Sequence, residues 1–461
     1  MSTFLKKMGP SLAVLGLAIA GCQPDLDAPA AGTSGTADFT SYVAIGNSLT
    51  AGYSDGGLYN EAQATSYPSI LAKQFARTGK GPSTFVQPAF ADNQQDGSGH
   101  IKLQLVNGAA APVQPTAANQ YLGEKLAVTG QSLVGGQLQL AAYTGAQPDN
   151  LGIPGISVLS SVSALTNGLA PYGLINPFYE RLLTSTAEKA TKDYVTYIAQ
   201  KTPTFFTCWM GSNDVLTYAT NGGVISATNP FSNLTDTTRF GIGYRAILNT
   251  ASKAGTVKGV VANIPNVANV PYFTTVAVPA VIASIKANTQ LPNAAQASLY
   301  ITTGTGTVRE ATTGDLLLLT SSSVIGTTSS ASPLPLGVGY SATLANPLPS
   351  QYVLDATELA AVQARTKELN TIIARTATKY KLGLADMNTF FNGIATNPVY
   401  IDATTNTTTF ATGNLFSLDG VHPTPRGYAV IANEFIRVIN QTYGASVPSV
   451  NPNDYRAVLF P

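Results

Sequence analysis

Charged residues are scarce in this chain of 461 residues. Lys, Arg, Asp and Glu together make up 11% of it, whereas an average soluble domain has about 25%. The formal net charge is +1 and no basic stripe is visible, so the sequence lacks the electrostatic footprint of a nucleic-acid-binding protein. Global disorder is excluded as well, because hydrophobic residues make up 44% of the chain and can bury a substantial core.

Cysteine and histidine are rarer still. The cysteines are Cys22 and Cys208, and the histidines are His100 and His422. Such low numbers exclude a disulfide framework and also exclude zinc sites built from several Cys or His ligands. Imidazole chemistry therefore has two candidate residues. Cys208 lies in an apolar run and is expected to be a small buried core residue.

The N-terminus has the pattern of an export signal. Lys6 and Lys7 precede an apolar stretch over residues 12–20 that is too short to span a bilayer. This stretch ends in Ile-Ala-Gly-Cys at residues 19–22, which resembles a bacterial lipobox, in which the cysteine becomes N-terminal and lipidated after cleavage. We therefore predict a signal peptide over residues 1–21 and a lipid anchor on Cys22. The alternative is an ordinary signal peptide with an incidental cysteine.

The predicted anchor places the protein in the cell envelope, attached to a membrane through the lipid on Cys22. Gln23 follows the cysteine, whereas an Asp there often retains lipoproteins at the inner membrane. The resemblance therefore implies the outer membrane of a Gram-negative bacterium. Residues 22–40 are rich in Pro, Ala, Gly, Ser and Thr, which predicts a flexible tether between the anchor and the body.

Four short apolar runs in the body predict buried strands, at residues 42–45, 204–210, 257–264 and 383–387. Helices are expected over residues 187–200, over residues 355–379 and after Thr424-Pro425. Asp355 and Glu358 have the spacing of a capping box, and Thr424-Pro425 is typical of an N-cap followed by proline at the first helical position. Strands that alternate with helices predict an α/β fold with a mostly parallel sheet.

Two regions interrupt this alternation. Residues 85–147 are rich in Gly, Gln and Pro, and residues 271–349 are rich in Thr, Ser and Ala. We interpret both as insertions, with some β-structure, into a single domain that spans residues 41–461. The alternative is an independent second domain.

A serine and a histidine lie where a parallel α/β sheet can form a site. Ser48 follows the first predicted strand in Gly-Asn-Ser-Leu-Thr, at a strand-to-helix turn on the carboxyl edge of the sheet. His422 precedes the last helix, and Asp419 can bond one ring nitrogen while the other takes a proton. Each string is ambiguous alone, since such residues also serve as ordinary helix caps and surface residues. His100 has no acid at a useful spacing and is not expected to act as a base.

Two further turns carry candidate hydrogen-bond donors. Asn213 follows the second predicted strand, where its side-chain amide can donate to a developing oxyanion; an ordinary Asx turn is the alternative. Gly155 ends the string Asn-Leu-Gly-Ile-Pro-Gly, and a glycine lets a backbone N–H approach a substrate closely; a plain Pro/Gly turn is the alternative. Asp214 is expected to brace the loop beside Asn213.

The order of these strings resembles the SGNH hydrolases, also called GDSL esterases, which are serine esterases and lipases on a flavodoxin-like sheet. The four initials of the family name fall on Ser48, Gly155, Asn213 and His422. The resemblance implies a three-layer sandwich, and it covers the core but not most of the two insertions. One departure is Asn47, because the family usually has Asp directly before its serine.

The resemblance also implies an activity, the hydrolysis of carboxylic esters (acyl esters or carbohydrate O-acetyl esters) through an acyl-enzyme. Ser48 would be the nucleophile, His422 the base and Asp419 the acid that orients it. The backbone N–H groups of Ser48 and Gly155 and the side-chain amide of Asn213 would bind the oxyanion. The substrate would be a small-molecule, glycan or lipid ester, and neither metal nor organic cofactor is needed. The alternative is a non-catalytic surface lipoprotein that binds glycans or partners on the same scaffold.

Overall fold

The computed structural model describes residues 32–106, 108–113, 124–131, 138–162, 176–183, 185–227 and 229–461. The predicted signal peptide over residues 1–21, the predicted anchor at Cys22 and the first part of the predicted tether lie outside the described residues. In the described part of the chain, no helix is both long and apolar enough to cross a membrane.

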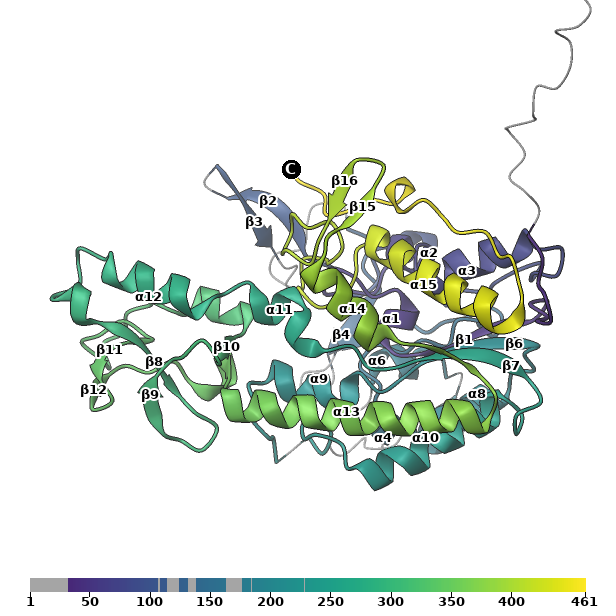
Figure 1. Cartoon of the computed structure of the whole chain (residues 1–461), viewed down its shortest axis with the longest axis horizontal. Helices are drawn as coiled ribbons and strands as arrows, with labels where there is room; N and C mark the ends of the chain where they lie inside the picture. Colours follow the sequence, from purple (N-terminus) through teal and green to yellow (C-terminus); the bar gives the residue numbers. More distant parts are fainter. Residues whose placement is uncertain are drawn as a thin grey trace, which may run out of the picture.

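A parallel four-stranded sheet forms the core of the fold and lies between helices (Figure 1). Its strands, in spatial order, are β1 (Tyr42–Gly46), β6 (Phe205–Trp209), β7 (Lys258–Ala262) and β14 (Gly383–Ala385). Each strand pairs in parallel with the next. They coincide with the four apolar runs of the sequence, so the predicted strands and the predicted α/β fold class are confirmed.

The outer edge of β1 is covered by residues 149–153, which do not form a full strand. The Leu151 N–H donates to the Ala44 carbonyl at 2.7 Å, and the Ile153 N–H donates to the Gly46 carbonyl at 3.0 Å. This segment therefore runs parallel to β1 and ends at the same edge of the sheet.

Helices cover both faces of the sheet and complete three layers. Successive side chains of a strand point to opposite faces, so Val43 and Phe206 enter one hydrophobic cluster while Tyr42 and Phe205 enter another. The helices of the first cluster include α8 (Tyr194–Ala199), α10 (Thr237–Ala251) and α13 (Ala356–Lys379); those of the second include α3 (Tyr67–Ala76), α14 (Met387–Thr396) and α15 (Pro425–Tyr443). Shorter elements are α1 (Ser48–Ala51), α2 (Asn60–Ala64), α4 (Val158–Ser161), α6 (Pro177–Glu180), α9 (Asn213–Thr220), β15 (Val399–Ile401) and β16 (Thr404–Asn406).

Two long helices begin where the sequence predicts. Asp355 and Glu358 form a reciprocal capping box at the start of α13. Thr424 caps α15 by accepting the Gly427 N–H, and proline is the first helical residue. These local hydrogen bonds replace the intrahelical partners that the first N–H groups of a helix lack.

The helix predicted over residues 187–200 is wrong as a single element. The chain forms α7 (Thr186–Thr191) and then α8, with a break between them. The break arises because Asp193 acts as a new N-cap and accepts the Thr196 N–H at 2.7 Å.

Antiparallel β-structure occupies both interrupting regions. In the described part of the first, β2 (Lys102–Val106) pairs with β3 (Ala109–Val113), and β4 (Val128–Gln131) pairs with β5 (Leu138–Leu140). The second contains α11 (Pro271–Thr274), α12 (Val278–Lys286) and a sheet in the order β12 (Leu344–Ala345), β11 (Val338–Ser341), β8 (Ser298–Thr302) and β9 (Val308–Glu310). It has its own hydrophobic cluster, and β10 (Leu316–Leu317) pairs with β13 (Val353–Leu354) before the chain enters α13. Figure 1 shows this region at one end of the molecule, away from the central sheet.

Residues 32–40 are folded, in contrast to the flexible tether predicted through residue 40. Phe39 is fully buried and stacks on Phe75 with 4.0 Å between ring centroids. The Thr36 N–H donates to the Tyr443 carbonyl at 2.9 Å, at the end of α15. The composition of the segment predicts flexibility, but the burial of Ala37 and Phe39 and the backbone hydrogen bonds to the rest of the chain hold it in place.

Candidate active site

Ser48 stands at the turn between β1 and α1, as predicted. At Gly46 a Cβ atom would lie 2.0 Å from Thr50 Oγ1, so only glycine lets the chain turn this tightly. Asn47 caps α1, because its side-chain oxygen accepts the Leu49 N–H at 3.1 Å. The turn leaves Ser48 as the first residue of the helix, 7% exposed, at the carboxyl edge of the sheet.

The structure joins the predicted serine, histidine and aspartate in one hydrogen-bonded chain. His422 Nε2 lies 2.8 Å from Ser48 Oγ, and His422 Nδ1 lies 2.8 Å from Asp419 Oδ2. A neutral imidazole with its proton on Nδ1 donates to the carboxylate and accepts from the hydroxyl. This is the geometry of a Ser-His-Asp triad, although 374 residues separate the serine from the histidine.

Asp419 is largely buried and yet ionised. Burial opposes its charge, but the imidazole of His422 and the hydrogen bonds from His422 and Val421 lower the pKa of Asp419 to about 2. Oδ1 accepts the backbone N–H groups of Val421 and His422, each at 2.8 Å. The carboxylate is therefore charged at neutral pH, where it can stabilise an imidazolium.

Gly155 lies in a turn, whereas Asn213 lies at the start of a helix just after β6. Asn213 is the first residue of α9, and its amide nitrogen donates to the Ile156 carbonyl at 2.8 Å, which leaves its second N–H for a ligand. Gly155 follows the segment beside β1 and has a φ of +80°, a conformation that favours glycine. Asp214 joins the two segments, because its carboxylate accepts the Val158 N–H at 2.8 Å.

A small cavity of ≈ 50 Å³ lies beside the serine and is lined by Ser48, Asn213 and His422. Gly155 is not among the residues that line it. The other walls are mostly apolar and come from α1, α9, α14 and the loops after β7 and before α15. They include Leu49, Leu216, Ile264, Val267, Phe391 and Phe416. The cavity therefore offers space for a small apolar group next to the hydroxyl.

Sequence reasoning missed the residues that hold this site in place. The Gly56 N–H donates to Asp419 Oδ2 at 2.8 Å, and the Ser417 hydroxyl donates to Asp419 Oδ1 at 3.2 Å. The Tyr53 ring packs against the His422 ring with 4.7 Å between centroids. None of these residues belongs to a motif. Closeness in sequence to the motif serine or histidine is the signal that points to them.

The remaining histidine has a different setting. His100 stacks on the Tyr59 ring with 3.9 Å between centroids and does not line the cavity beside Ser48. Burial, assisted by the charge of Lys102, lowers the pKa of His100 to about 4. Among the residues that the structure describes, no group of three or more His, Cys, Asp or Glu side chains is placed to hold a metal ion.

A comparison with known families identifies the chain. The profile of the GDSL-like lipase/acylhydrolase family matches residues 42–435, which include all four strands of the central sheet and the residues from Ser48 to His422. A comparison with curated proteins finds none that matches. Because the matched span covers most of its length and contains the whole site, the chain belongs to the GDSL-like lipase/acylhydrolase family.

Proposed function

We propose that the protein is a serine esterase that hydrolyses carboxylic esters through an acyl-enzyme on Ser48. Membership of the family implies the hydrolysis of ester bonds. The observation that carries the finer proposal is the position of the His422 ring, 2.8 Å from both Ser48 Oγ and Asp419 Oδ2. A serine hydroxyl is a weak nucleophile alone, and an adjacent base activates it.

The chemistry divides into two half-reactions. Ser48 Oγ attacks the ester carbonyl while its proton passes to His422 Nε2, and Asp419 stabilises the imidazolium that forms. The imidazolium then protonates the leaving alcohol oxygen, the C–O bond breaks, and the acyl group stays on the serine. Water, deprotonated by His422, attacks the acyl-enzyme, which releases the acid and restores the Ser48 hydroxyl.

Three donors are proposed for the oxyanion of each tetrahedral intermediate. They are the N–H groups of Ser48 and Gly155 and the free N–H of the Asn213 amide. Loss of one such donor typically costs about 2.7–4 kcal/mol of transition-state stabilisation, or 10²–10³ in rate. The hydrogen bond from Asn213 to the Ile156 carbonyl supports this role, because it fixes the amide before substrate arrives.

The size of the cavity supports a preference for short esters. A water-sized group needs about 10–15 Å³ of such space, so the ≈ 50 Å³ beside Ser48 has room for a few such groups. We therefore propose that the part of the ester that enters this cavity is short and apolar, in the range from acetyl to butyryl. Both small acyl esters and carbohydrate O-acetyl esters meet this condition.

The lipobox pattern supports a location for the enzyme. We propose that Cys22 is lipidated and holds the enzyme on a membrane of the cell envelope, in the outer membrane of a Gram-negative bacterium. A metabolically supplied fatty acid should label the wild-type protein in the producing bacterium but not the Cys22→Ala variant. Labelling of both proteins would contradict the proposed anchor.

The test of the activity uses a fragment that begins at Asp25. We expect it to hydrolyse p-nitrophenyl acetate and butyrate faster than the octanoate, and we expect Ser48→Ala to abolish this turnover and labelling by a fluorophosphonate. Ser323→Ala, at an exposed position of the second inserted region, is the matched control and should behave as wild type. Equal rates in wild type and Ser48→Ala, or a folded wild type without turnover or labelling, would favour the non-catalytic surface lipoprotein.

A further inference from the structure

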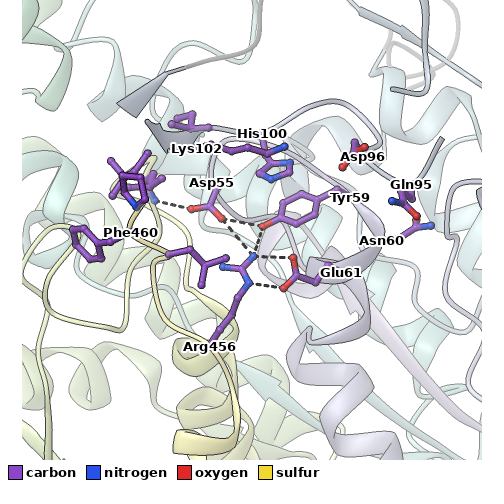
Figure 2. Close-up of a pocket in the computed structure, with 15 residues that line it drawn as sticks. Asp55, Tyr59, Asn60, Glu61, Gln95, Asp96, His100, Lys102, Arg456 and Phe460 are labelled. Carbon is purple, nitrogen blue, oxygen red and sulfur yellow. Dashed lines mark hydrogen bonds and ion pairs between the residues drawn. The ribbon is translucent and has the colours of Figure 1, made fainter. Parts of the chain in front are cut away.

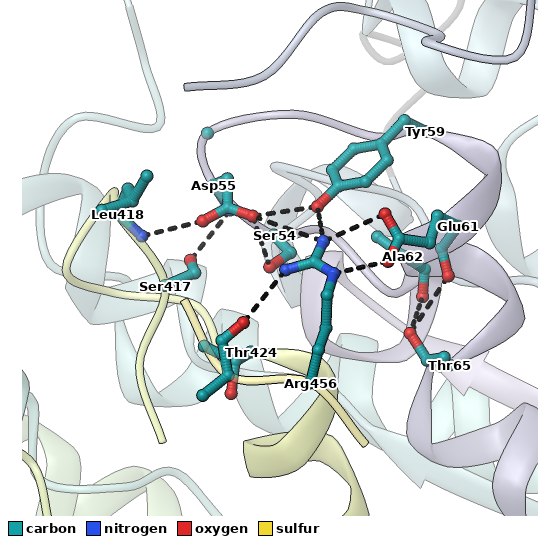
Figure 3. A network of polar contacts seen from close by, with 12 residues as sticks. Ser54, Asp55, Tyr59, Glu61, Ala62, Thr65, Ser417, Leu418, Thr424 and Arg456 are labelled. Carbon is teal, nitrogen blue, oxygen red and sulfur yellow. Dashed lines mark hydrogen bonds and ion pairs between the residues drawn. The ribbon is translucent and has the colours of Figure 1, made fainter. Parts of the chain in front are cut away.

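A short turn after α1 holds the loop that carries Asp419. The carboxylate of Asp55 is buried, and its Oδ1 accepts the Leu418 N–H at 3.0 Å. The Asp55 N–H donates to Ser417 Oγ at 2.8 Å, and Gly56 donates to Asp419 itself at 2.8 Å. Figure 3 shows the contacts of Asp55 with Ser417 and Leu418. The chain just after the serine therefore fixes three consecutive residues at the other side of the site.

The second carboxylate oxygen of Asp55 lies near the guanidinium group of Arg456. Asp55 Oδ2 accepts the Tyr59 hydroxyl at 2.9 Å and lies 3.9 Å from Arg456 Nη2. Arg456 also donates to the Tyr59 oxygen at 2.9 Å and forms an ion pair with Glu61 (Figures 2 and 3). It comes from the segment after α15, beyond residue 435, where the family match ends. Arg456 and Asp55 line a pocket of ≈ 520 Å³, and Leu418, next to Asp419, lines it too.

The charge of Asp55 depends on these neighbours. Burial raises the pKa of Asp55, and the nearby charge of Asp419 adds to the increase. The Leu418 N–H, the Tyr59 hydroxyl and the Arg456 charge act in the opposite direction. The other ionisable groups around this carboxylate are Glu61 on α2 and His100, Lys102 and Asp96 of the first inserted region, which line the same pocket. The charge of Arg456 therefore favours the ionised form of Asp55, against its burial and against the second carboxylate of Asp419.

We propose that Arg456 and Asp55 are positioning residues for the Asp419–His422 pair. Arg456, in the C-terminal segment, holds Asp55, and Asp55 in turn holds the loop of residues 417–419. We call this arrangement the clamp. The proposal rests on the proposed esterase function. Asp419 already accepts hydrogen bonds on both oxygens, so its position is set by the chain around it. A displacement of Asp419 would move the hydrogen bond to His422 Nδ1, and misplacement by about 1 Å can cost 10²-fold in rate.

Three substitutions at two residues, and one double variant, test the clamp in the fragment that begins at Asp25. Asp55→Asn offers one oxygen where the carboxylate offers two, so we expect kcat on p-nitrophenyl acetate to fall about 10-fold or more with KM within about twofold. Arg456→Gln should lower kcat in the same way but less, and Arg456→Lys should recover part of the loss. The double variant should be no worse than Asp55→Asn, because Arg456 acts through Asp55.

The pH profile separates positioning from a general loss of structure. Without the cation Asp55 takes up a proton more readily, so the kcat of Arg456→Gln should begin to fall at a higher pH than wild type on acidification. The double variant, which has no carboxylate at position 55, should lack this additional shift. Arg437→Gln is the matched control, since Arg437 pairs with Glu434 on α15 and its side chain is 59% exposed. We expect this control to match wild type in kcat and in pH profile.

The outcomes distinguish this proposal from the proposed function. Absence of Ser48-dependent turnover in wild type would overturn the function and the clamp together. An active wild type with unchanged kcat in folded Asp55→Asn and Arg456→Gln would overturn the clamp alone, and so would a raised KM at unchanged kcat. If Asp55→Asn does not fold, Arg456→Gln and Arg456→Lys decide, with kcat referred to the folded fraction measured by circular dichroism.

Discussion

Asp419 contacts three parts of the candidate site, which are the His422 imidazole, the turn after α1 and its own loop. In Asp419→Asn one side-chain oxygen becomes an N–H donor that cannot accept from His422 Nδ1, so the imidazole loses its correct tautomer. We expect kcat to fall by about 10³–10⁴-fold with little change in KM. Steady-state kinetics on p-nitrophenyl acetate measure this effect. A loss below about tenfold would contradict the assigned orienting role.

The pKa of Asp214 is shifted in the opposite direction from that of Asp419. Burial raises its pKa to about 6 against hydrogen bonds from Val158 and Leu159. Because this folded-state value exceeds the unfolded value of 3.8, the stabilisation is present below pH 3.8 and is lost as the pH rises through about 6. Relative to wild type, Asp214→Asn should therefore gain up to about 3 kcal/mol in free energy of unfolding between pH 4 and pH 7.

Urea unfolding of wild type and Asp214→Asn at both pH values measures this gain. Glu358, whose pKa burial raises to about 7, is present in both proteins, so its contribution cancels in the difference. A difference between the two proteins that stays constant with pH would contradict the assignment.

At the residue scale the sequence points to candidate residues for the proposed chemistry but not to the residues around them. The strings that hold Ser48, Asp419 and His422 are each ambiguous alone, and it is their order along the chain, similar to that of a known family, that makes these residues candidates. The residues that line the cavity beside Ser48 come from separate elements that the sheet brings together. No spacing in the sequence indicates that these elements lie next to one another. Arg456 lies outside every motif, so its contact with Asp55 appears only in three dimensions.

Among the elements, α13 links the sandwich to the second inserted region. Asp355 accepts the N–H groups of Thr357 and Glu358, and it also accepts the N–H of Gly304 at 3.2 Å from the inserted region. Asp355→Ala should lower the free energy of unfolding by about 1–2 kcal/mol, since N-cap loss costs about that much. Chemical denaturation measures the change, and kcat should stay within twofold of wild type. Asp355→Asn keeps an acceptor and should lose less.

The strands and the long helices were predictable because local signals and tertiary packing agree there. β1 and β6 are buried along their whole length, and β7 is buried after Lys258, so these strands appear as short apolar runs. The error over residues 187–200 has a local cause that the apolar pattern hides, because Asp193 competes for the backbone N–H groups and starts a new helix. The pairing of residues 149–153 with β1 could not be predicted, because that segment has no strand pattern of its own.

For the molecule as a whole, Cys208 reports on the integrity of the sheet. It lies on β6, is fully buried, and its thiol pKa is raised by burial. In the fragment that begins at Asp25 it is the only cysteine. A thiol reagent such as DTNB should therefore modify no thiol in the native protein and one thiol after denaturation, because exposure of Cys208 requires the sheet to open. Rapid modification under native conditions would contradict the central position of β6.

The candidate site joins residues from opposite ends of the chain, so it can form only late in synthesis. One edge of β1 pairs with residues 149–153 and the other with β6, and the acid and base follow only at residues 419 and 422. A chain that emerges from its N-terminal end thus exposes Ser48 long before it contains His422. Contacts this distant in sequence form slowly. The proposed ester hydrolysis can therefore begin only when nearly the whole chain has been synthesised, because a shorter chain contains Ser48 but lacks Asp419 and His422.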